Sequence, residues 1–217
     1  MAFKAVLFDL DGTLLDTLQD ISDATNAALG KLGFPLHNIQ TYRHFMGEGM
    51  VALAFKALPD SFRNSDTINR LSAYIVKEYS IRWAHYTQPF HGIPELLDAL
   101  VERGMKMAVL SNKPHEFAVE QVEKLLPHWN FSTVIGASGA IPRKPDPTGA
   151  LEISKKLQVS PAEFLYLGDT DIDMKTATAA GMYPVGALWG FDNADELLAG
   201  GAKALIQRPA ELLPLLW

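Results

Sequence analysis

Short apolar runs that end in polar residues recur along the chain, and this pattern predicts buried strands. The first run covers residues 6–8, and later runs begin near residues 105, 133, 164 and 183. Segments with helical periodicity lie between the later runs. Because strands that alternate with helices form a parallel sheet covered on both faces, the pattern predicts an α/β fold with a doubly wound, Rossmann-like sheet.

A helical pattern separates the first run from the second. Apolar residues three or four positions apart predict a helix over 17–32, which Gly33 and Pro35 end. Segments 39–58 and 65–86 also have helical patterns and contain no convincing strand. The stripe of the first of these helices consists of Leu18, Ile21, Ala24, Ala28 and Leu32.

This helical stretch is too long to be a single crossover, since about 95 residues separate the first two strands and a crossover needs only about a dozen or more. We therefore predict an α/β core made of residues 1–15 and 89–217, interrupted by an inserted α-helical unit over 16–88. Within the core, residues 171–180 predict a short helix that Gly181 ends.

Composition narrows the class of protein. The 217 residues are 48% hydrophobic and 20% charged, as is ordinary for a globular chain, and the net charge of −6 disfavours nucleic acid or an anionic membrane as the main partner. There are no cysteines, which excludes thiol chemistry and disulfides. No signal-peptide pattern and no membrane-length apolar stretch occur, so a cytoplasmic location is expected. The oligomeric state stays open.

The first predicted strand ends in two carboxylates, Asp9 and Asp11, followed by Gly12. Residues two apart on a strand point to the same side. Two charges ~4 Å apart repel by roughly 4 kcal/mol at an effective dielectric of 20. A divalent cation, or a proton held on one of the pair, would offset this repulsion.

Polar clusters also follow the later strands. Ser111 and Asn112 follow one strand, the acid-rich segment 168–173 follows another, and Lys144 precedes a proline in the loop between them. Ligands bind beyond the carboxyl ends of the strands in such sheets, so these clusters are expected at one edge. Carboxylates, a hydroxyl and an ammonium group together suit a magnesium ion and a phosphate.

The segments "DLDGT", "LSN", "RKPDP" and "GDTDID" resemble the four signature motifs of the haloacid dehalogenase-like superfamily of phosphohydrolases. The helical insertion after the first motif resembles the α-helical cap of that superfamily. Within it, "YRHFMGEGM" (42–50) and "FHGIPELLDAL" (90–100) are similar to the pattern of the phosphoglycolate phosphatase group. The resemblance implies a phosphatase that acts on a small phosphorylated metabolite.

The resemblance also implies residue roles. Asp9 is expected to attack phosphorus and form an aspartyl-phosphate, and Asp11 to act as general acid and then general base. Ser111 and Lys144, with the backbone of Asn112, are expected to bind the transferring phosphoryl group.

The implied metal is Mg²⁺, held by Asp9, the backbone carbonyl of Asp11, and Asp169. Asp173 is expected to orient Lys144 or a metal-bound water, and Thr13 to add a hydrogen bond near the first turn. We interpret Asp171, next to these residues, as a helix cap or a solvent-exposed acid.

The helical insertion is expected to select the substrate. Arg43, Gly47 and Gly49 are candidate substrate-contacting residues, because a small substrate with a carboxylate needs a cation outside the phosphate site. Hinges are expected near residues 15–17 and 88–92, where the chain crosses between the two parts.

Three other functions stay open from the sequence. A sugar-phosphate mutase of the same superfamily would return the phosphoryl group to a sugar. A phospho-aspartate receiver module uses similar residues, although its phosphorylated aspartate ends a middle strand and it lacks a cap. A catalytically silent binding module is disfavoured, since all acidic and basic positions of the four motifs are occupied. Phosphoglycolate, other sugar phosphates and pyrophosphate stay open as substrates.

Overall fold

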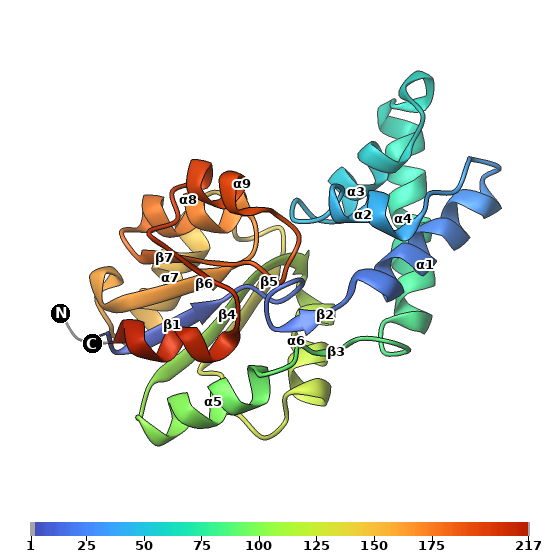
Figure 1. The fold of residues 1–217 in the computed structure, drawn as a ribbon. Helices are drawn as coiled ribbons and strands as arrows, with labels where there is room; N and C mark the ends of the chain where they lie inside the picture. Colours follow the sequence, from blue (N-terminus) through green and yellow to red (C-terminus); the bar gives the residue numbers. More distant parts are fainter. Residues whose placement is uncertain (1–2, 217) are drawn as a thin grey trace. The chain divides into compact units, whose positions relative to one another are not determined.

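The computed structural model describes residues 3–216, and these form two compact units. One unit contains the chain up to Leu15 and from Pro89 onward, and the other is Asp16–Gln88 (Figure 1). Where the chain passes between them, two short strands pair: β2 (Leu15–Asp16) and β3 (Gln88–Pro89).

Within the described residues, six strands of the first unit form one sheet in the order β5-β4-β1-β6-β7-β8. All neighbouring strands of this sheet pair in parallel. The strands are β1 (Ala5–Phe8), β4 (Lys106–Pro114), β5 (Thr133–Ala137), β6 (Phe164–Gly168), β7 (Tyr183–Ala187) and β8 (Ala204–Ile206). The chain thus runs outward from β1 on one side and then on the other, which confirms the predicted doubly wound α/β class.

Alternate residues of the central strand face two separate apolar cores. Val6 and Phe8 point into one core, and Ala5 and Leu7 point into the other. The first core is closed by α5 (Ile93–Glu102), α6 (His115–Leu125) and the 3₁₀ segment η3 (Pro209–Leu216). The second is closed by α7 (Thr148–Leu157) and α8 (Asp171–Ala180). The 3₁₀ turn η2 (Pro161–Glu163) precedes β6, and α9 (Ala194–Gly200) packs against α8. Figure 1 shows these helices on opposite faces of the sheet.

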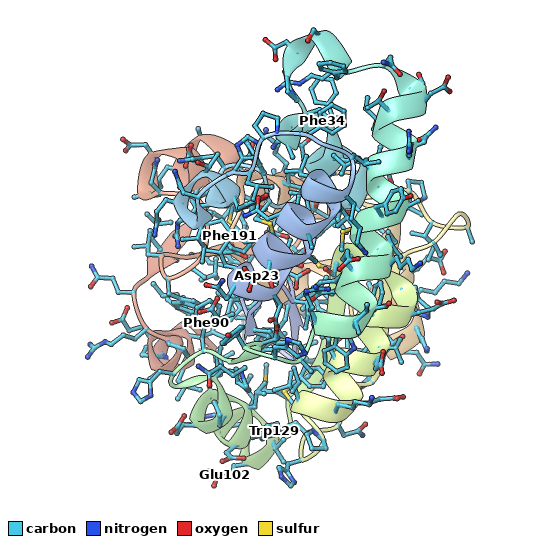
Figure 2. The ribbon with its side chains drawn as sticks, turned by 90° about the vertical axis from the view of Figure 1, so that its right-hand side faces the viewer. Asp23, Phe34, Phe90, Glu102, Trp129 and Phe191 are labelled. Carbon is cyan, nitrogen blue, oxygen red and sulfur yellow. The ribbon has the colours of Figure 1, made fainter. Side chains whose placement is uncertain are left out.

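The unit Asp16–Gln88 is helical. Its elements are α1 (Leu18–Lys31), α2 (Ile39–Arg43), α3 (Met50–Ala57), the 3₁₀ turn η1 (Asp60–Phe62) and α4 (Ser65–Arg82). The long helix α4 packs against α1 and α3, and α1 also packs against α2. Phe34, labelled in Figure 2, packs edge-on against Phe62 in the loop region of this unit.

A buried carboxylate holds two segments of the helical unit together. The buried carboxylate of Asp20 accepts hydrogen bonds from the backbone N–H groups of Tyr86 and Thr87 and from the hydroxyl of Thr87. These bonds hold the return segment against the first turn of α1. Because these N–H groups are bound by a side chain, the predicted helix 65–86 ends at Arg82.

Two predicted elements differ from the structure. The segment 39–58 forms two helices, one ending at Arg43 and one beginning at Met50, and Gly47 and Gly49 between them have φ values of +96° and +88°, which a helix does not accept. The strand predicted to end before Ser111 continues to Pro114, with a shift of its register against β5 after Leu110. The helix over 171–180 has the predicted bounds and ends at Gly181 in the left-handed conformation.

Candidate active site

The carboxyl ends of three adjacent strands, β4, β1 and β6, carry most of the candidate residues. Asp9 follows β1, Asp169 follows β6, and Ser111 and Asn112 lie in the last part of β4. Lys144 reaches the same place from the loop between β5 and α7. The topology therefore brings together four segments that are far apart in the sequence, as expected for the edge of a doubly wound sheet.

The ammonium group of Lys144 lies between two buried carboxylates. Its Nζ is 2.8 Å from Oδ1 of Asp9 and 2.6 Å from Oδ1 of Asp173. The ammonium of Lys144 is the close charged partner of Asp9 Oδ1, which is itself buried. Lys144 thus offsets part of the buried negative charge, while one oxygen of Asp9 keeps its capacity to bind another group.

Asn112 fixes the backbone that carries Lys144. Its side-chain Nδ2 donates to the carbonyl of Lys144 at 3.0 Å, and its Oδ1 accepts from the N–H of Lys144 at 2.9 Å. These two hydrogen bonds join β4 to the loop, much as a pair of backbone hydrogen bonds joins two neighbouring strands. The side chain of Asn112 therefore positions the lysine.

Asp11 has a lysine partner that the sequence interpretation missed. Nζ of Lys113 donates to Oδ1 of Asp11 at 2.7 Å, and the lysine side chain is 1% exposed. The signal was available, because Lys113 precedes Pro114 just as Lys144 precedes Pro145. Each acid at the end of the first strand therefore has its own ammonium partner.

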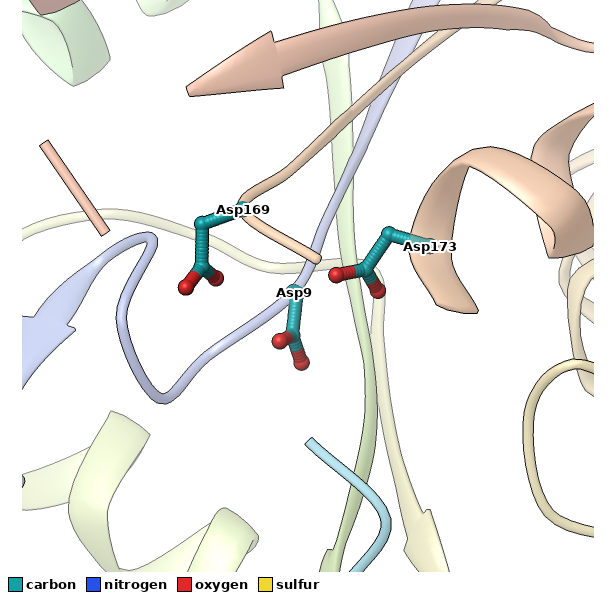
Figure 3. A group of neighbouring side chains, drawn as sticks. All are labelled: Asp9, Asp169 and Asp173. Atoms are coloured by element: carbon teal, nitrogen blue, oxygen red, sulfur yellow. The ribbon is translucent and has the colours of Figure 1, made fainter. Parts of the chain in front are cut away.

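Three buried aspartates meet at the sheet edge. Oxygens of Asp9, Asp169 and Asp173 all lie within 4.8 Å of one another, so this group can hold a metal ion. Figure 3 shows the three side chains, with Asp9 between Asp169, which follows β6, and Asp173, which lies on α8. A cluster of hard carboxylate oxygens is the ligand set that Mg²⁺ prefers.

The three aspartates differ in remaining hydrogen-bond capacity. Asp173 accepts Lys144 and the Tyr166 hydroxyl on Oδ1, and the N–H and hydroxyl of Thr170 on Oδ2. Since a carboxylate has about four lone-pair sites, Asp173 is saturated. Asp169 accepts one bond on each oxygen, at 2.6 Å from the Thr13 hydroxyl and 2.9 Å from the N–H of Phe191.

Burial and neighbouring charges shift the pKa values of the acids and of the lysine at the site. Burial raises the pKa of Asp9 to about 7, and Asp173 and Asp11 add to the effect while Lys144 opposes it. Burial and the charges of Asp9 and Asp173 raise the pKa of Asp169 well above its usual value. Burial acts to lower the pKa of Lys144, but the nearby carboxylates raise it well above its usual value. Four carboxylates and two ammonium groups leave a formal charge of −2 at the site, which one divalent cation neutralises.

The remaining candidates of the core have clear positions. Ser111 is buried, and its Oγ accepts a hydrogen bond from the N–H of Lys113 at 3.3 Å. Asp171 begins α8 and pairs with Lys175 on the same helix. Arg43, Gly47 and Gly49 belong to the helical unit, where Arg43 ends α2 and is half-buried.

Comparison with known proteins identifies the family. The family model of the haloacid dehalogenase-like hydrolases matches residues 6–187. The chain belongs to this family, and it is a hydrolase of the phosphatase type. Within the described residues, no helix has the length and apolar character needed to span a membrane.

Among its relatives, the phosphoglycolate phosphatase of Aquifex aeolicus is 32% identical over 213 residues, which covers 98% of this chain and 96% of the relative. The phosphoglycolate phosphatase of Pseudomonas putida is 29% identical over 214 residues, with 97% and 79% covered. The crystal structure of a candidate phosphoglycolate phosphatase from Lactobacillus delbrueckii subsp. bulgaricus is similar with a TM-score of 0.93 and 30% identity, and 100% of this chain and 99% of that chain are covered.

Proposed function

We propose that the protein is a magnesium-dependent phosphatase that hydrolyses a small phosphomonoester, with phosphoglycolate as the preferred candidate, through an aspartyl-phosphate. The observation that carries this proposal is the arrangement around Asp9: a buried carboxylate at the end of β1, 2.8 Å from a buried lysine and close to two further acids. The similarity to phosphoglycolate phosphatases supports the substrate class.

In the proposed first step, an oxygen of Asp9 attacks phosphorus and the bond from phosphorus to the leaving oxygen breaks. Asp11, in its protonated form, transfers its proton to that leaving oxygen, so that an alcohol departs. In the second step, Asp11 takes a proton from a water molecule, which attacks phosphorus. The acyl-phosphate bond then breaks, which releases inorganic phosphate and restores the Asp9 carboxylate.

The residues present fit a magnesium ion. Asp9 and Asp169 keep free lone pairs, whereas Asp173 is saturated by its four donors. We therefore assign Asp9, Asp169 and the backbone carbonyl of Asp11 as the protein ligands, and Asp173 as the residue that orients Lys144. When bound, Mg²⁺ supplies positive charge for the phosphoryl oxygens and for the acid cluster.

Lys144, Ser111 and the backbone N–H of Asn112 are proposed to bind the phosphoryl oxygens. The buried ammonium of Lys144 is held in place on two sides, by its carboxylate partners and by the paired contact of its backbone with Asn112. A donor that is fixed before substrate binds needs no reorganisation during the reaction. We further propose that the unit Asp16–Gln88 acts as the cap that selects the substrate.

The test is a measurement of inorganic phosphate released from 2-phosphoglycolate and a panel of sugar phosphates. Wild-type protein should release phosphate with Mg²⁺ present, lose this activity in excess chelator, and recover it poorly with Ca²⁺, whose looser coordination misplaces the ligands. Asp9→Asn should lose nearly all turnover, and Asp195→Asn, at an exposed helix start, is the matched control.

Several results would contradict the proposal. Retention of more than about a tenth of the activity in Asp9→Asn would remove the nucleophile assignment. Full activity in excess chelator would remove the metal assignment. Transfer of phosphate between positions of a sugar, without release, would favour a mutase. Turnover of other phosphomonoesters but not phosphoglycolate would leave the phosphatase and exclude the preferred substrate.

A further inference from the structure

The loop after β7 contacts the acid cluster, although no sequence prediction included it. The N–H of Phe191 donates to Oδ2 of Asp169 at 2.9 Å, and the N–H of Asp192 donates to the backbone carbonyl of the same aspartate at 3.2 Å. The loop is also fastened to the start of α8, because Oδ2 of Asp192 accepts from the N–H of Asp171 at 2.7 Å. Both the side chain and the backbone of Asp169 are therefore held from this loop.

Trp189 connects the same loop to the turn after Asp9. Its indole Nε1–H donates to the backbone carbonyl of Thr13 at 3.0 Å, and the hydroxyl of Thr13 donates to Oδ1 of Asp169 at 2.6 Å. The contacts close a ring that runs from Asp169 through Thr13 and Trp189 to Phe191 and back. Each oxygen of Asp169 thus accepts one donor from one side of the ring.

Two glycines allow the backbone to approach Asp169 closely. A Cβ added at Gly190 would lie 2.2 Å from Cβ and 2.3 Å from Oδ2 of Asp169. A Cβ added at Gly12, where φ is +88°, would lie 2.2 Å from the same Oδ2 and 2.7 Å from the ring of Phe191. The space for the carboxylate is therefore defined by backbone on two sides, and a side chain at either position would push it away.

We propose that Trp189, Gly190 and Phe191 are positioning residues that hold the Asp169 carboxylate in the orientation needed to bind the metal. This inference rests on the proposed function, because it concerns the affinity of the proposed metal site. The partners that fix a ligating carboxylate typically change metal affinity by about 10–100-fold when they are removed. The loop 188–193 is then part of the site although none of its side chains binds metal or substrate.

The first variant removes one hydrogen bond and keeps an aromatic ring. Trp189→Phe deletes the indole N–H, and Trp129→Phe is the matched control, because its indole donates to Asp98 at 2.7 Å and both tryptophans are half-buried against the same core. Trp129 also lies apart from Phe191 in Figure 2. Trp189→Phe should weaken metal binding roughly tenfold, at the lower end of the expected range, and the control should not.

The second variant displaces the carboxylate directly. Gly190→Ala places a methyl group where Asp169 lies, and Gly139→Ala is the matched control, because an added Cβ there meets nothing within 4 Å. Gly190→Ala should weaken metal binding on the order of 100-fold. If Gly190→Ala does not fold, as judged by its melting temperature in chelator, the comparison of Trp189→Phe with Trp129→Phe tests the proposal.

The measurement is the dissociation constant of Mn²⁺ without substrate, from the electron paramagnetic resonance signal of the free ion, and of Mg²⁺ by calorimetry. The metal dependence of turnover is a second readout: Trp189→Phe should raise the metal concentration at half-maximal rate and regain the wild-type kcat at saturating metal. If the wild type binds metal, and folded Trp189→Phe and Gly190→Ala bind it with the same affinity, the positioning role of the loop is wrong. The metal assignment then stands. No metal binding by the wild type overturns the metal assignment and, with it, this inference.

Discussion

Two buried lysines at the sheet edge explain how four acids can gather there. Lys144 contacts Asp9 and Asp173, and Lys113 contacts Asp11. An unpaired buried carboxylate would shift its pKa strongly upward, and burial already does so for Asp9, to about 7. The lysines hold part of the cluster ionised without neutralising it fully. The remaining negative charge is what makes a divalent cation favourable.

The first prediction concerns Lys144. Lys144→Ala should lower the phosphatase rate by about 10²–10³-fold, the usual loss when one fixed donor to a transition-state oxygen is removed. Phosphate binding should also weaken, because the site loses the ammonium group held between Asp9 and Asp173. Steady-state kinetics on a simple phosphomonoester measure the first effect, and calorimetry measures the second.

The matched control is Lys4→Ala, since Lys4 also pairs with an acid, Glu163, but its side chain is 64% exposed. An exposed pair contributes roughly 0–1 kcal/mol to stability, so this variant should keep the wild-type rate. Unchanged kinetics in Lys144→Ala would show that the lysine is structural only.

At the scale of elements, α4 is tied to α1 by a buried carboxylate. Glu78 on α4 pairs with Lys31 on α1 and with Arg82 one turn further along α4, and its side chain is 2% exposed. The hydrogen bond from Lys31 lowers the pKa of Glu78 more than burial raises it, and the charges of Arg82 and Lys31 lower it further. A carboxyl group whose folded pKa is depressed stabilises the fold only while it is ionised.

The second prediction follows from this sign. Glu78→Gln should destabilise the protein by about 1–3 kcal/mol at pH 7, the scale of a hydrogen bond to a charged group. The contribution is complete above the unfolded pKa of about 4.5 and is lost as the pH falls through the lower folded pKa. The difference in unfolding free energy between wild type and variant should therefore shrink as the pH falls below about 4.5.

Urea unfolding at several pH values measures this difference. Glu120→Gln is the control, because Glu120 pairs with Lys124 at an exposed i, i+4 position and should change stability little at any pH. A Glu78→Gln effect of equal size at pH 7 and pH 3 would show that packing, not charge, accounts for it.

How far these elements follow from sequence depends on the kind of signal. The strands of the core and the helix 171–180 were predictable, because apolar runs and a terminal glycine are local signals. The break between α2 and α3 was not predicted, since the helical pattern over 39–58 includes Gly47 and Gly49, whose φ values are positive in the structure. The pairing of β2 with β3 depends on contacts between distant segments.

The candidate site shows the same division. Asp9, Ser111, Lys144 and Asp169 were expected at one edge because each lies at or beyond the end of an apolar run, and the structure brings them together. The loop after β7 was missed, because it contributes a backbone N–H group to the Asp169 carboxylate and an indole N–H to the Thr13 carbonyl, and neither is a ligating side chain. Sequence patterns reveal ligating side chains more readily than the backbone that positions them.

For the molecule as a whole, the proposed function assigns chemistry to one compact unit and substrate selection to the other. The core unit contains every acid and lysine of the proposed reaction, and in that mechanism these groups act on the phosphoryl group, the metal and the leaving oxygen, which all phosphomonoesters share. They cannot distinguish one phosphomonoester from another. We therefore propose that selection belongs to the unit Asp16–Gln88, whose segment from Arg43 to Met50 carries a cation and two glycines with positive φ.

The last prediction tests this assignment at Arg43. If Arg43 pairs with the carboxylate of phosphoglycolate, Arg43→Ala should lower kcat/KM for that substrate by an amount equivalent to about 2–4 kcal/mol, the scale of a broken buried charge pair. The same change should barely affect p-nitrophenyl phosphate, which has no carboxylate to lose. Arg70→Ala, which removes an exposed arginine from α4 of the same unit, is the control and should affect neither substrate. Equal losses on both substrates would make Arg43 a structural residue and would place substrate selection elsewhere in the unit.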